Sequence, residues 1–368
     1  MNLRVVLVSP YSLGVYGGVQ EQVVAMSREL AGRGHEVLII APDEHDRSVV
    51  DSPATVQRFG PRTSLRANGS RAPLTLSPWA ARRAQWAIRE FRPDVVHFHE
   101  PFAPLVGWVA LAAHEFASVG TFHRSGDGPA LRLSAPLLRH WAQHLDAAAA
   151  VSEAASETIR RAARVHAAVL FNGFDTNRFT QVPRERTDQP VVLTVGRLEE
   201  RKGTWCAIGA VRAHNARGEG PWRLVIIGEG PQSAKLRALA GADPAVVFAG
   251  AVDDAQKRAW LRRADVVVAP ATRGESFGLV LLEAMASEAA VVASDIEGYR
   301  EAAAGHATLF APGDVGALEA AIVAALASDS IERRLAARGH AEQWSISRLV
   351  DQYDTLYASA RRRFGARR

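Results

Sequence analysis

Short, continuously apolar segments alternate with amphipathic segments along this chain, and this alternation constrains the fold more than any other feature of the sequence. Several of the apolar segments are rich in β-branched residues, end near a Gly or Pro, and precede a stretch with helical spacing. Such strands are typical of a parallel sheet that helices cover on both faces. The sequence therefore predicts a doubly wound α/β fold. The first series of expected strands is Val5–Val8, Val37–Ile40, Asp94–Phe98, Ser118–Phe122, Ala148–Val151 and Ala168–Leu170.

The same alternation starts again near residue 190, after the polar stretch Gly173–Gln189, which reads as a linker. A chain of 368 residues is long enough for two domains of roughly 150 residues each. We therefore expect two Rossmann-like domains that face each other across a cleft, at residues 1–180 and 181–345, with a helix and basic tail at 346–368. The second series of expected strands is Val191–Val195, Leu224–Ile227, Val246–Ala249, Val266–Ala269 and Val291–Ala293.

The composition excludes several other classes of protein. Hydrophobic residues make up 48% of the chain and charged residues 23%, which is too apolar for a disordered protein and ordinary for a globular one. The single cysteine, Cys206, excludes a disulfide within the chain and a cysteine-based zinc site. The first residues lack the pattern of a signal peptide, and no uninterrupted apolar stretch reaches about 18 residues. We therefore expect a cytoplasmic protein.

The strongest functional motif is the segment 274–283, in which two glutamates flank a Ser-Phe-Gly turn. The segment follows the expected strand Val266–Ala269, so it lies at the carboxyl edge of the sheet, where such folds bind ligands. A helix that begins near Leu279 offers free N–H groups to a pyrophosphate. Glu275 is suited to accept hydrogen bonds from sugar hydroxyls, and Glu283 from a ribose diol. The alternative is a capped amphipathic helix with two solvated acids.

A charged loop, Gly196–Gly203, follows the expected strand Val191–Val195 directly. Arg197 and Lys202 lie between its two glycines, so the loop can hold two cations against a diphosphate. Taken alone, the loop is equally compatible with a solvated turn. The chain contains no Asp-x-Asp sequence, which is the usual handle for a divalent metal on a nucleotide diphosphate. We therefore expect the two cations and a helix end, without a metal, to meet the diphosphate charge.

Two weaker features belong to the first half of the chain. Gly17 and Gly18 precede a predicted helix and let the backbone approach a ligand closely. His123 follows an expected strand, where a single histidine is more often structural than catalytic. The segment 97–100 carries two alternating histidines and a glutamate, but the spacing supplies no third ligand for a metal.

Together these motifs resemble those of the GT-B glycosyltransferases of family 4, which retain the anomeric configuration of the sugar and need no metal. The resemblance spans nearly the whole chain. Within the family it is nearest to the actinobacterial phosphatidylinositol mannosyltransferases, which use GDP-mannose. The matching segments are Pro10-Tyr11-Ser12, Gly17-Gly18-Val19-Gln20, His97-x-His99-Glu100-Pro101, Thr121-Phe122-His123, Asn172-Gly173-x-Asp175, Gly196-Arg197 with Lys202-Gly203, and Gly274 to Glu283.

The resemblance implies a role for each matching residue. The donor diphosphate would lie against the two loop cations and the helix start at Gly278, and His123 would contact the donor sugar near the scissile bond. The final helix would cross back to the first domain. The implied catalytic residues are His123, Arg197, Lys202 and Glu275; the implied donor-binding residues are Gly17, Gly18, Gly196, Val252, Ser276, Phe277, Gly278, Leu279 and Glu283; the implied acceptor-binding residues are Gln20, Asn68 and Arg124.

The differences from the mannosyltransferase pattern concern the acceptor. They leave the residues expected to bind the donor unchanged, but they leave open whether the acceptor is an inositol lipid. Arg124 also suits a different acceptor with a phosphate or a carboxylate, whereas Gln20 and Asn68 suit a polyol headgroup. The differing positions are Gly14 in place of an acid, Ala67 in place of an aromatic residue, Phe102 in place of a small polar residue, and Arg124 in place of a threonine.

Basic charge and one amphipathic stretch point toward a membrane surface. The formal net charge is +5, and residues 346–368 hold six arginines against two aspartates. Between residues 131 and 145, Leu138, Trp141 and Leu145 fall on one helical face with Leu131, which is typical of an interfacial helix. A helix that only covers its own domain has the same pattern. The hypothesis is peripheral contact with the anionic inner face of the plasma membrane.

The sequence thus favours an enzyme that transfers a sugar, with mannose from GDP-mannose preferred, to a hydroxyl of a lipid-linked or polyol acceptor such as phosphatidylinositol. The alternatives are a glycosyltransferase that uses a UDP-sugar and a soluble acceptor, a sugar-nucleotide epimerase on the same fold, and a catalytically silent sugar-nucleotide sensor. Nucleic-acid binding is disfavoured, because the net charge is modest, the cations are spread out and no binding motif occurs.

Overall fold

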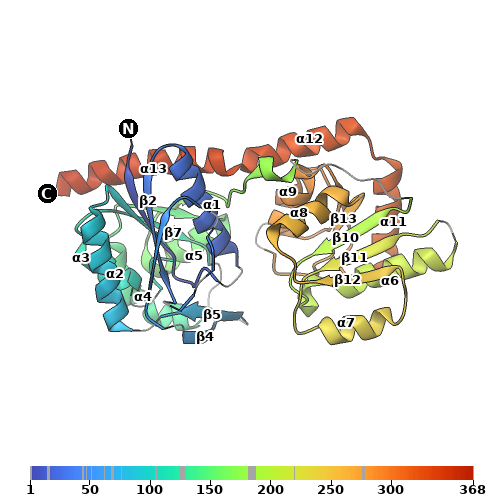
Figure 1. Cartoon of the computed structure of the whole chain (residues 1–368), viewed down its shortest axis with the longest axis horizontal. Coiled ribbons are helices and arrows are strands. Elements are labelled where there is room, and N and C mark those ends of the chain that lie inside the picture. Colours follow the sequence, from blue (N-terminus) through green and yellow to red (C-terminus); the bar gives the residue numbers. More distant parts are fainter. Residues whose placement is uncertain are drawn as a thin grey trace. The chain divides into compact units, whose positions relative to one another are not determined.

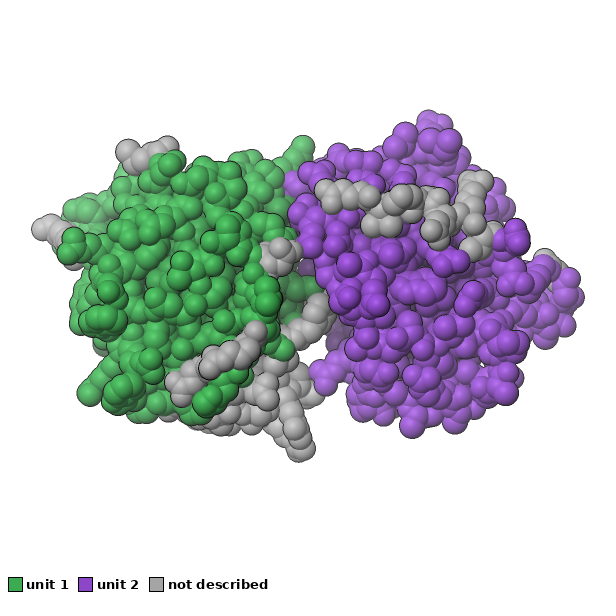
Figure 2. Space-filling view, in the orientation of Figure 1, with its two compact units in different colours: residues 1–174, 346–368 green, residues 175–345 purple. Residues whose placement is uncertain are grey.

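The computed structural model describes the chain apart from residues 1, 15–16, 44, 47, 51, 62, 68–69, 76, 104–105, 125–128, 181–187, 219, 276–277 and 368 (Figure 1). The described residues form two compact units, which Figure 2 shows in different colours. The first unit comprises residues 1–174 and 346–368, and the second comprises residues 175–345. The division falls after Phe174, whereas the sequence analysis placed it after residue 180.

The first unit is built on a parallel sheet of seven strands in the order β3-β2-β1-β6-β7-β8-β9. Its central strands are almost completely buried, as expected for apolar runs covered on both faces. A separate antiparallel hairpin joins β4 and β5. The strands are β1 (Arg4–Val8), β2 (Glu36–Pro42), β3 (Thr55–Phe59), β4 (Thr63–Ala67), β5 (Ser70–Leu74), β6 (Val95–His99), β7 (Ala117–Phe122), β8 (Ala147–Ala150) and β9 (Ala168–Val169).

Helices cover both faces of this sheet. On one face, α1 and α13 pack against alternate residues such as Val5 and Leu7. On the other face, α2, α3, α4 and α5 pack against Val6 and Val8. The final helix therefore belongs to the core of the first unit. The helices are α1 (Gly18–Gly32), α2 (Pro78–Phe91), α3 (Val106–Ala113), α4 (Pro129–Ala142), α5 (Glu153–Ala163) and α13 (Ile346–Arg367).

The second unit repeats the design with a six-stranded parallel sheet in the order β12-β11-β10-β13-β14-β15. Several of its helices begin at a capping side chain, as Asp253 does for α8, where it forms a capping box with Gln256. The strands are β10 (Val191–Val195), β11 (Arg223–Ile227), β12 (Val246–Gly250), β13 (Val266–Ala269), β14 (Ala290–Ser294) and β15 (Thr308–Phe310). The α-helices are α6 (Thr204–Ala216), α7 (Ser233–Ala240), α8 (Asp254–Arg263), α9 (Leu279–Ala286), α10 (Glu297–Ala303), α11 (Val315–Ala327) and α12 (Ile331–Ala341).

In each sheet the strand order reverses direction once, and ligands of doubly wound folds bind beside that point at the carboxyl ends of the strands. The reversal lies between β1 and β6 in the first unit and between β10 and β13 in the second. The segments 196–203 and 274–283 follow β10 and β13, the segment 17–20 follows β1, Glu100 follows β6, and His123 follows the neighbouring β7. The topology therefore places both sets of candidate residues where such a fold binds ligands.

The fold class predicted from the sequence is confirmed, and every expected strand is present. Strands β3 and β15 and the hairpin β4–β5 were not predicted from the sequence. Within the described part of the chain, no helix combines the length and the apolar character needed to cross a bilayer.

Candidate functional site

In the second unit, the loops after β10, β11 and β13 are in close backbone contact at the carboxyl edge of the sheet. A side chain on Gly203, where φ is +66°, would overlap the carbonyl oxygen of Pro270, which follows β13. A side chain on Gly228, where φ is +128°, would overlap the carbonyl oxygen of Gly196. Only glycine fits a positive φ and such close backbone contact without strain. The loops after β10, β11 and β13 therefore form one rigid rim, and Gly196 is part of it.

Glu275 is the centre of the charged groups on this rim. Its Oε1 atom lies 2.8 Å from Nζ of Lys202 and 2.6 Å from Nη1 of Arg201, while its side chain is only 12% exposed. The second cation of the expected pair, Arg197, lies apart: it pairs with Glu199 at 3.3 Å and is 56% exposed. The structure thus brings Lys202 and Glu275 together and leaves Arg197 toward solvent.

Arg201 is a residue that the sequence analysis missed. Besides Glu275, it donates to the carbonyl oxygen of Gly274 at 3.0 Å and to Oε2 of Glu199 at 3.0 Å. It therefore ties the charged loop after β10 to the loop that precedes α9. Its position between Arg197 and Lys202 was the available signal, but only the fold shows that Arg201 and Lys202 turn toward Glu275 while Arg197 does not.

The helix start at Gly278 depends on glycine for two reasons. Its φ is +89°, and a Cβ there would lie 2.6 Å from Cδ1 of Tyr299, a fully buried ring on α10. Helix α9 begins at the next residue, Leu279, and its first N–H groups are directed toward the carboxyl edge of the sheet, which suits an anionic ligand. The neighbouring Ser276 and Phe277, which the resemblance assigns to the donor, lie outside the described residues.

Glu283, one turn further along α9, is held by a buried lysine. Its Oε1 accepts a hydrogen bond from Nζ of Lys257 on α8 at 2.9 Å, and the two side chains are 13% and 9% exposed. Lys257 was not predicted as a site residue, although it is one of only three lysines in the chain. Val252, expected near the base, lies partly buried just before α8.

In the first unit, Gly17 and Gly18 begin α1 as expected. Gly17 has an extended backbone, and a Cβ there would lie 2.6 Å from Oε1 of Gln20, whereas a Cβ on Gly18 would meet nothing within 4 Å. Gln20 is 7% exposed and donates to the carbonyl oxygen of Ser12 at 3.4 Å, so it shapes the turn before α1. Asn68, the other expected polyol ligand, lies outside the described residues.

His123 lies directly after β7 and is held at two points. Its backbone N–H donates to Oε1 of Glu100 at 2.6 Å, and its ring Nε2 lies 3.0 Å from Nδ1 of His99. Burial lowers the pKa of His123 to about 4 and raises the pKa of Glu100. The imidazole is therefore neutral near pH 7, which suits a hydrogen-bonding role better than an ionic one. Arg124 beside it is exposed.

His97 and His99 continue from His123 as one row of rings, which we call the histidine stack. The ring centroids of His97 and His99 lie 4.5 Å apart, and those of His99 and His123 lie 5.3 Å apart. Both ring nitrogens of His97 are hydrogen-bonded, to Tyr357 of α13 at 2.8 Å and to Thr121 at 2.7 Å. His97 is therefore a packed structural residue, which disfavours the metal pair suggested by the spacing. Across the described residues, no group of three or more His, Cys, Asp or Glu is arranged to hold a metal ion.

The predicted interfacial face of the stretch 131–145 is wrong for Leu138, Trp141 and Leu145, and the side chain of its fourth member, Leu131, lies outside the described residues. Leu138 and Leu145 are 6% and 8% exposed, and they belong to the core of the first unit, with Trp141 packed against it. An apolar stripe on a helix packs against the domain when a sheet lies beside it, and α4 does so here. The three described side chains of the stripe therefore pack into the domain core and are not available to a membrane.

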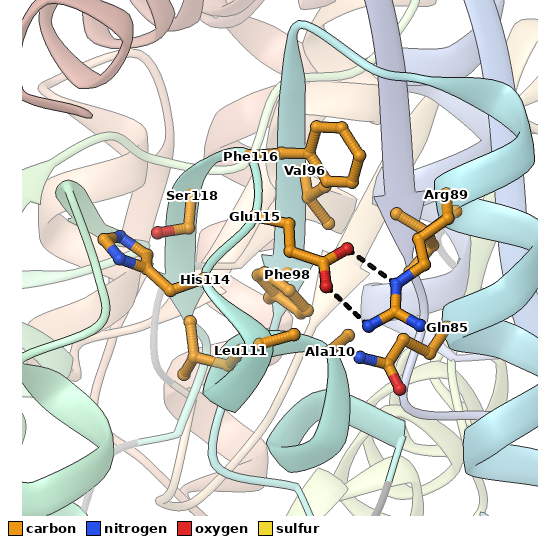
Figure 3. Close-up of a pocket in the computed structure, with 12 residues that line it drawn as sticks. Gln85, Arg89, Val96, Phe98, Ala110, Leu111, His114, Glu115, Phe116 and Ser118 are labelled. Carbon is orange, nitrogen blue, oxygen red and sulfur yellow. Dashed lines mark hydrogen bonds and ion pairs between the residues drawn. The ribbon is translucent and has the colours of Figure 1, made fainter. Parts of the chain in front are cut away.

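A small pocket between α2 and α3 belongs to neither candidate site. Arg89 lies across from Glu115 in a two-point ion pair with distances of 2.6 and 2.5 Å, and apolar residues such as Phe98 and Leu111 line the space (Figure 3). Its volume is about 20 Å³, which is room for about one water molecule. It is a gap in the packing of the helices on the sheet.

Comparisons with known proteins identify the class of enzyme to which these sites belong. A family described as "Glycosyltransferase Family 4" matches residues 16–178, and one described as "Glycosyl transferases group 1" matches residues 189–328. The phosphatidyl-myo-inositol mannosyltransferase of Mycolicibacterium smegmatis is 35% identical over 370 residues, which cover 96% of this chain and 94% of that protein. The chain is a family 4 glycosyltransferase. This glycosyltransferase is also 34% identical to the phosphatidyl-myo-inositol mannosyltransferase of Mycobacterium leprae, over 97% of this chain and 98% of that protein.

Solved structures agree with this assignment at the level of the fold. A glycosyltransferase from Rickettsia africae superposes with a TM-score of 0.74 over 98% of both chains, at 16% identity. A sucrose-phosphate synthase from Thermosynechococcus elongatus gives a TM-score of 0.73 over 97% of this glycosyltransferase and 98% of that chain, at 21% identity. The fold is therefore the GT-B fold of such enzymes.

Proposed function

We propose that this glycosyltransferase transfers mannose from GDP-mannose to a hydroxyl of an inositol-containing lipid, with retention of configuration and without a metal. The observation that carries the proposal is the pairing of Glu275 with Lys202 and Arg201 beside the start of α9. The proposal is supported because a largely buried carboxylate, which suits sugar hydroxyls, lies next to two cations and near a helix N-terminus, which suit a diphosphate. The relatives named phosphatidyl-myo-inositol mannosyltransferase support mannose and the inositol lipid.

Each group in the second unit has a task in this reaction. Lys202, Arg197 and the first N–H groups of α9 stabilise the diphosphate as negative charge develops on it, which is the largest contribution that such sites make. Glu275 accepts hydrogen bonds from hydroxyls of the sugar, and Glu283 accepts them from the ribose. Because Arg201 also pairs with Glu275, that carboxylate keeps a cation when Lys202 turns to the diphosphate.

The proposed chemistry is an exchange of bonds on one face of the sugar. The bond between the anomeric carbon and the β-phosphate oxygen breaks, and a bond to the acceptor oxygen forms on the same side. The proton of the acceptor hydroxyl passes to the departing phosphate oxygen. His123 donates a hydrogen bond to the sugar during this step, and Arg124 and Gln20 are proposed to face the acceptor.

We propose further that α2, and not α4, carries the contact with an anionic bilayer. Trp79 and Trp86 are 68% and 64% exposed, and Arg82 and Arg83 lie on the same face of this helix. Exposed tryptophan and arginine on one helix face suit the boundary of a bilayer with anionic headgroups.

Flotation with phosphatidylinositol-containing vesicles tests this contact: the double variant Trp79→Ser/Trp86→Ser should stay in the soluble fraction. The control Leu137→Ser, at an exposed position of α4, should still float with the vesicles, and equal flotation of the double variant would refute the contact.

A screen of GDP-, UDP- and ADP-sugars by thermal shift tests the donor, because binding stabilises the folded state by mass action. GDP-mannose should give the largest shift, and a larger shift with a UDP-sugar would overturn the choice of donor. Transfer of mannose to phosphatidylinositol tests the acceptor. The same transfer in the presence of EDTA tests the absence of a metal, and it should be unaffected. NMR of the product tests the stereochemistry, and it should show the α-mannoside. Glu275→Ala and Lys202→Ala should abolish transfer in a folded protein. Conversion of the donor without acceptor would instead indicate an epimerase.

A further inference from the structure

The two residues that precede Pro101 hold His123 from two sides. Glu100, with a φ of +50°, accepts the backbone N–H of His123, and His99 contacts its ring. His99 is 1% exposed and sits on β6, in register with Thr121 of β7. His123 follows Thr121 by two residues, so the strand register itself brings the two imidazole rings within hydrogen-bonding distance.

A single hydrogen lies between these two rings. Burial lowers the pKa values of His99 and His123, with His97 and His123 also disfavouring charge on His99, so both rings are neutral near pH 7. A neutral imidazole carries one N–H and one lone pair. Either His99 donates from Nδ1 to Nε2 of His123, or His123 donates from Nε2 to Nδ1 of His99. The two cases leave opposite groups on the outer nitrogens of the pair.

The outer nitrogen of His99 decides between the two cases. Its Nε2 is buried and has no hydrogen-bond partner among the described residues. If His123 were the donor, His99 would carry its hydrogen on this Nε2, and a buried N–H would be left without an acceptor. Orphaned N–H groups are rarer in proteins than unpaired acceptors, and leaving one buried costs about 1–3 kcal/mol. The favoured arrangement therefore has His99 donating from Nδ1, with only a lone pair on its Nε2.

We propose that His99 is a positioning residue that fixes His123 in the tautomer protonated at Nδ1. His123 then offers its remaining ring nitrogen to a ligand as an N–H donor, never as a base. This inference rests on the proposed function only in taking that ligand to be the transferred sugar. A neutral donor suits an uncharged sugar hydroxyl or ring oxygen, and it cannot remove a proton from the acceptor.

The far end of the histidine stack explains why His99 does not turn away. His97 packs on the ring of His99 and is itself fixed by Tyr357 and by Thr121, and Thr121 is in turn bonded to Tyr353 at 2.7 Å. Both tyrosines belong to α13. The C-terminal helix thus supports the ring of His99 through packing, with no direct contact to His123 in any of these bonds.

NMR of the full-length protein labelled with ¹⁵N-histidine tests the tautomer directly, because two-bond correlations distinguish a protonated Nδ1 from a protonated Nε2. His123 is assigned by the loss of its signals in His123→Gln. The Nδ1–H form should dominate in the wild-type protein. A dominant Nε2–H form would overturn the proposal, whatever the enzyme's substrate proves to be, and this measurement needs no variant of His99 to fold.

Kinetics then separate positioning from simple stability. His99→Leu should lower kcat about tenfold, equivalent to about 1.4 kcal/mol in the barrier, with little change in KM for the nucleotide sugar. His99→Asn, whose amide can donate from near the position of Nδ1, should recover most of kcat. The control Ser27→Ala removes a buried hydrogen bond to Val24 on α1, outside the histidine stack, and should leave both kcat and the His123 tautomer unchanged. Unchanged kcat in His99→Leu, or equal losses in His99→Leu and Ser27→Ala, would refute the positioning role. Absence of transfer from GDP-mannose in the wild-type protein would refute only the proposed function.

Discussion

Replacing Gly278 by alanine should destabilise the second unit more than a glycine-to-alanine change normally does. Gly278 has a φ of +89°, and alanine in the left-handed region costs about 1–2 kcal/mol. The added methyl group would also lie 2.6 Å from the ring of Tyr299, which is fully buried and cannot move without displacing α10. Overpacking of this kind costs about 1–3 kcal/mol more. The sum is a loss of about 2–5 kcal/mol in the free energy of unfolding.

Gly305 in the same unit provides a matched control. Its φ is +86°, but a Cβ there would meet nothing within 4 Å. Gly305→Ala therefore measures the backbone penalty alone, and the difference between the two variants measures the contact with Tyr299. Urea unfolding followed by tryptophan fluorescence gives both values, with slopes of about 1–3 kcal/mol per molar urea for small proteins. Gly278→Ala should unfold about 1 M earlier than Gly305→Ala, and it should also lose affinity for the nucleotide sugar, since α9 must shift. Equal midpoints for the two variants would refute the packing argument.

Three further predictions concern burial. In the unfolded chain the histidines take up protons below about pH 6.5, whereas in the folded protein burial lowers the pKa of His97 to about 3 and that of His123 to about 4. Each of these histidines should therefore lower the free energy of unfolding by about 1.4 kcal/mol at pH 5.5, relative to its value above pH 6.5. A thermal midpoint as high at pH 5.5 as at pH 7 would contradict this. Leu138→Ala leaves a cavity in the core and should lower the free energy of unfolding in urea by about 2–4 kcal/mol. Leu137→Ala, at a position that is 44% exposed, should lower it by less than about 1 kcal/mol. Equal losses in the two variants would contradict the burial of the face that carries Leu138. Lys257→Met should lower the free energy of unfolding by about 2–3 kcal/mol, because it leaves the carboxylate of Glu283 without its ion-pair partner. The double variant Lys257→Met/Glu283→Gln should recover most of this stability, and a double variant no more stable than the single one would refute the pairing.

The strands and the edge where the site lies could be predicted because their signals are local. A buried parallel strand is an apolar run, and the loops at the carboxyl ends of such strands are where these folds bind ligands. Lys202, Glu275 and Gly278 could therefore be predicted as candidate site residues from their place after β10 and β13. The missed strand β3 has the sequence Thr-Val-Gln-Arg-Phe and lies at the edge of the sheet. An edge strand needs little apolar character, so its pattern does not differ from that of a loop.

Residues whose roles depend on a distant partner could not be predicted from the sequence. Lys257 reads as a solvated helix residue, and only the packing of α8 beside α9 brings it to Glu283, 26 residues away. The stripe on α4 failed for a related reason: an amphipathic pattern shows that a helix has an apolar face, not what covers that face. The apolar face of α4 is covered by the core of the first unit, to which the sheet and neighbouring helices both contribute. The exposed face of α2 mixes its two tryptophans with arginines, so it forms no continuous apolar stripe in the sequence.

The charges of the second unit also explain why the cations can be concentrated at the rim before any ligand binds. Lys202 and Arg201 share the Glu275 carboxylate, and Lys257 is matched by Glu283, so the described rim holds few uncompensated charges. Around Glu275, two cations, Lys202 and Arg201, share one carboxylate, so the group carries a net positive charge. A diphosphate would bring negative charge to this group. In the proposed reaction, Lys202 can then turn to the diphosphate while Arg201 stays paired with Glu275. A lone lysine could not serve both groups, which is why the pairing of two cations with one carboxylate fits transfer from a sugar diphosphate better than a carboxylate and a lysine alone.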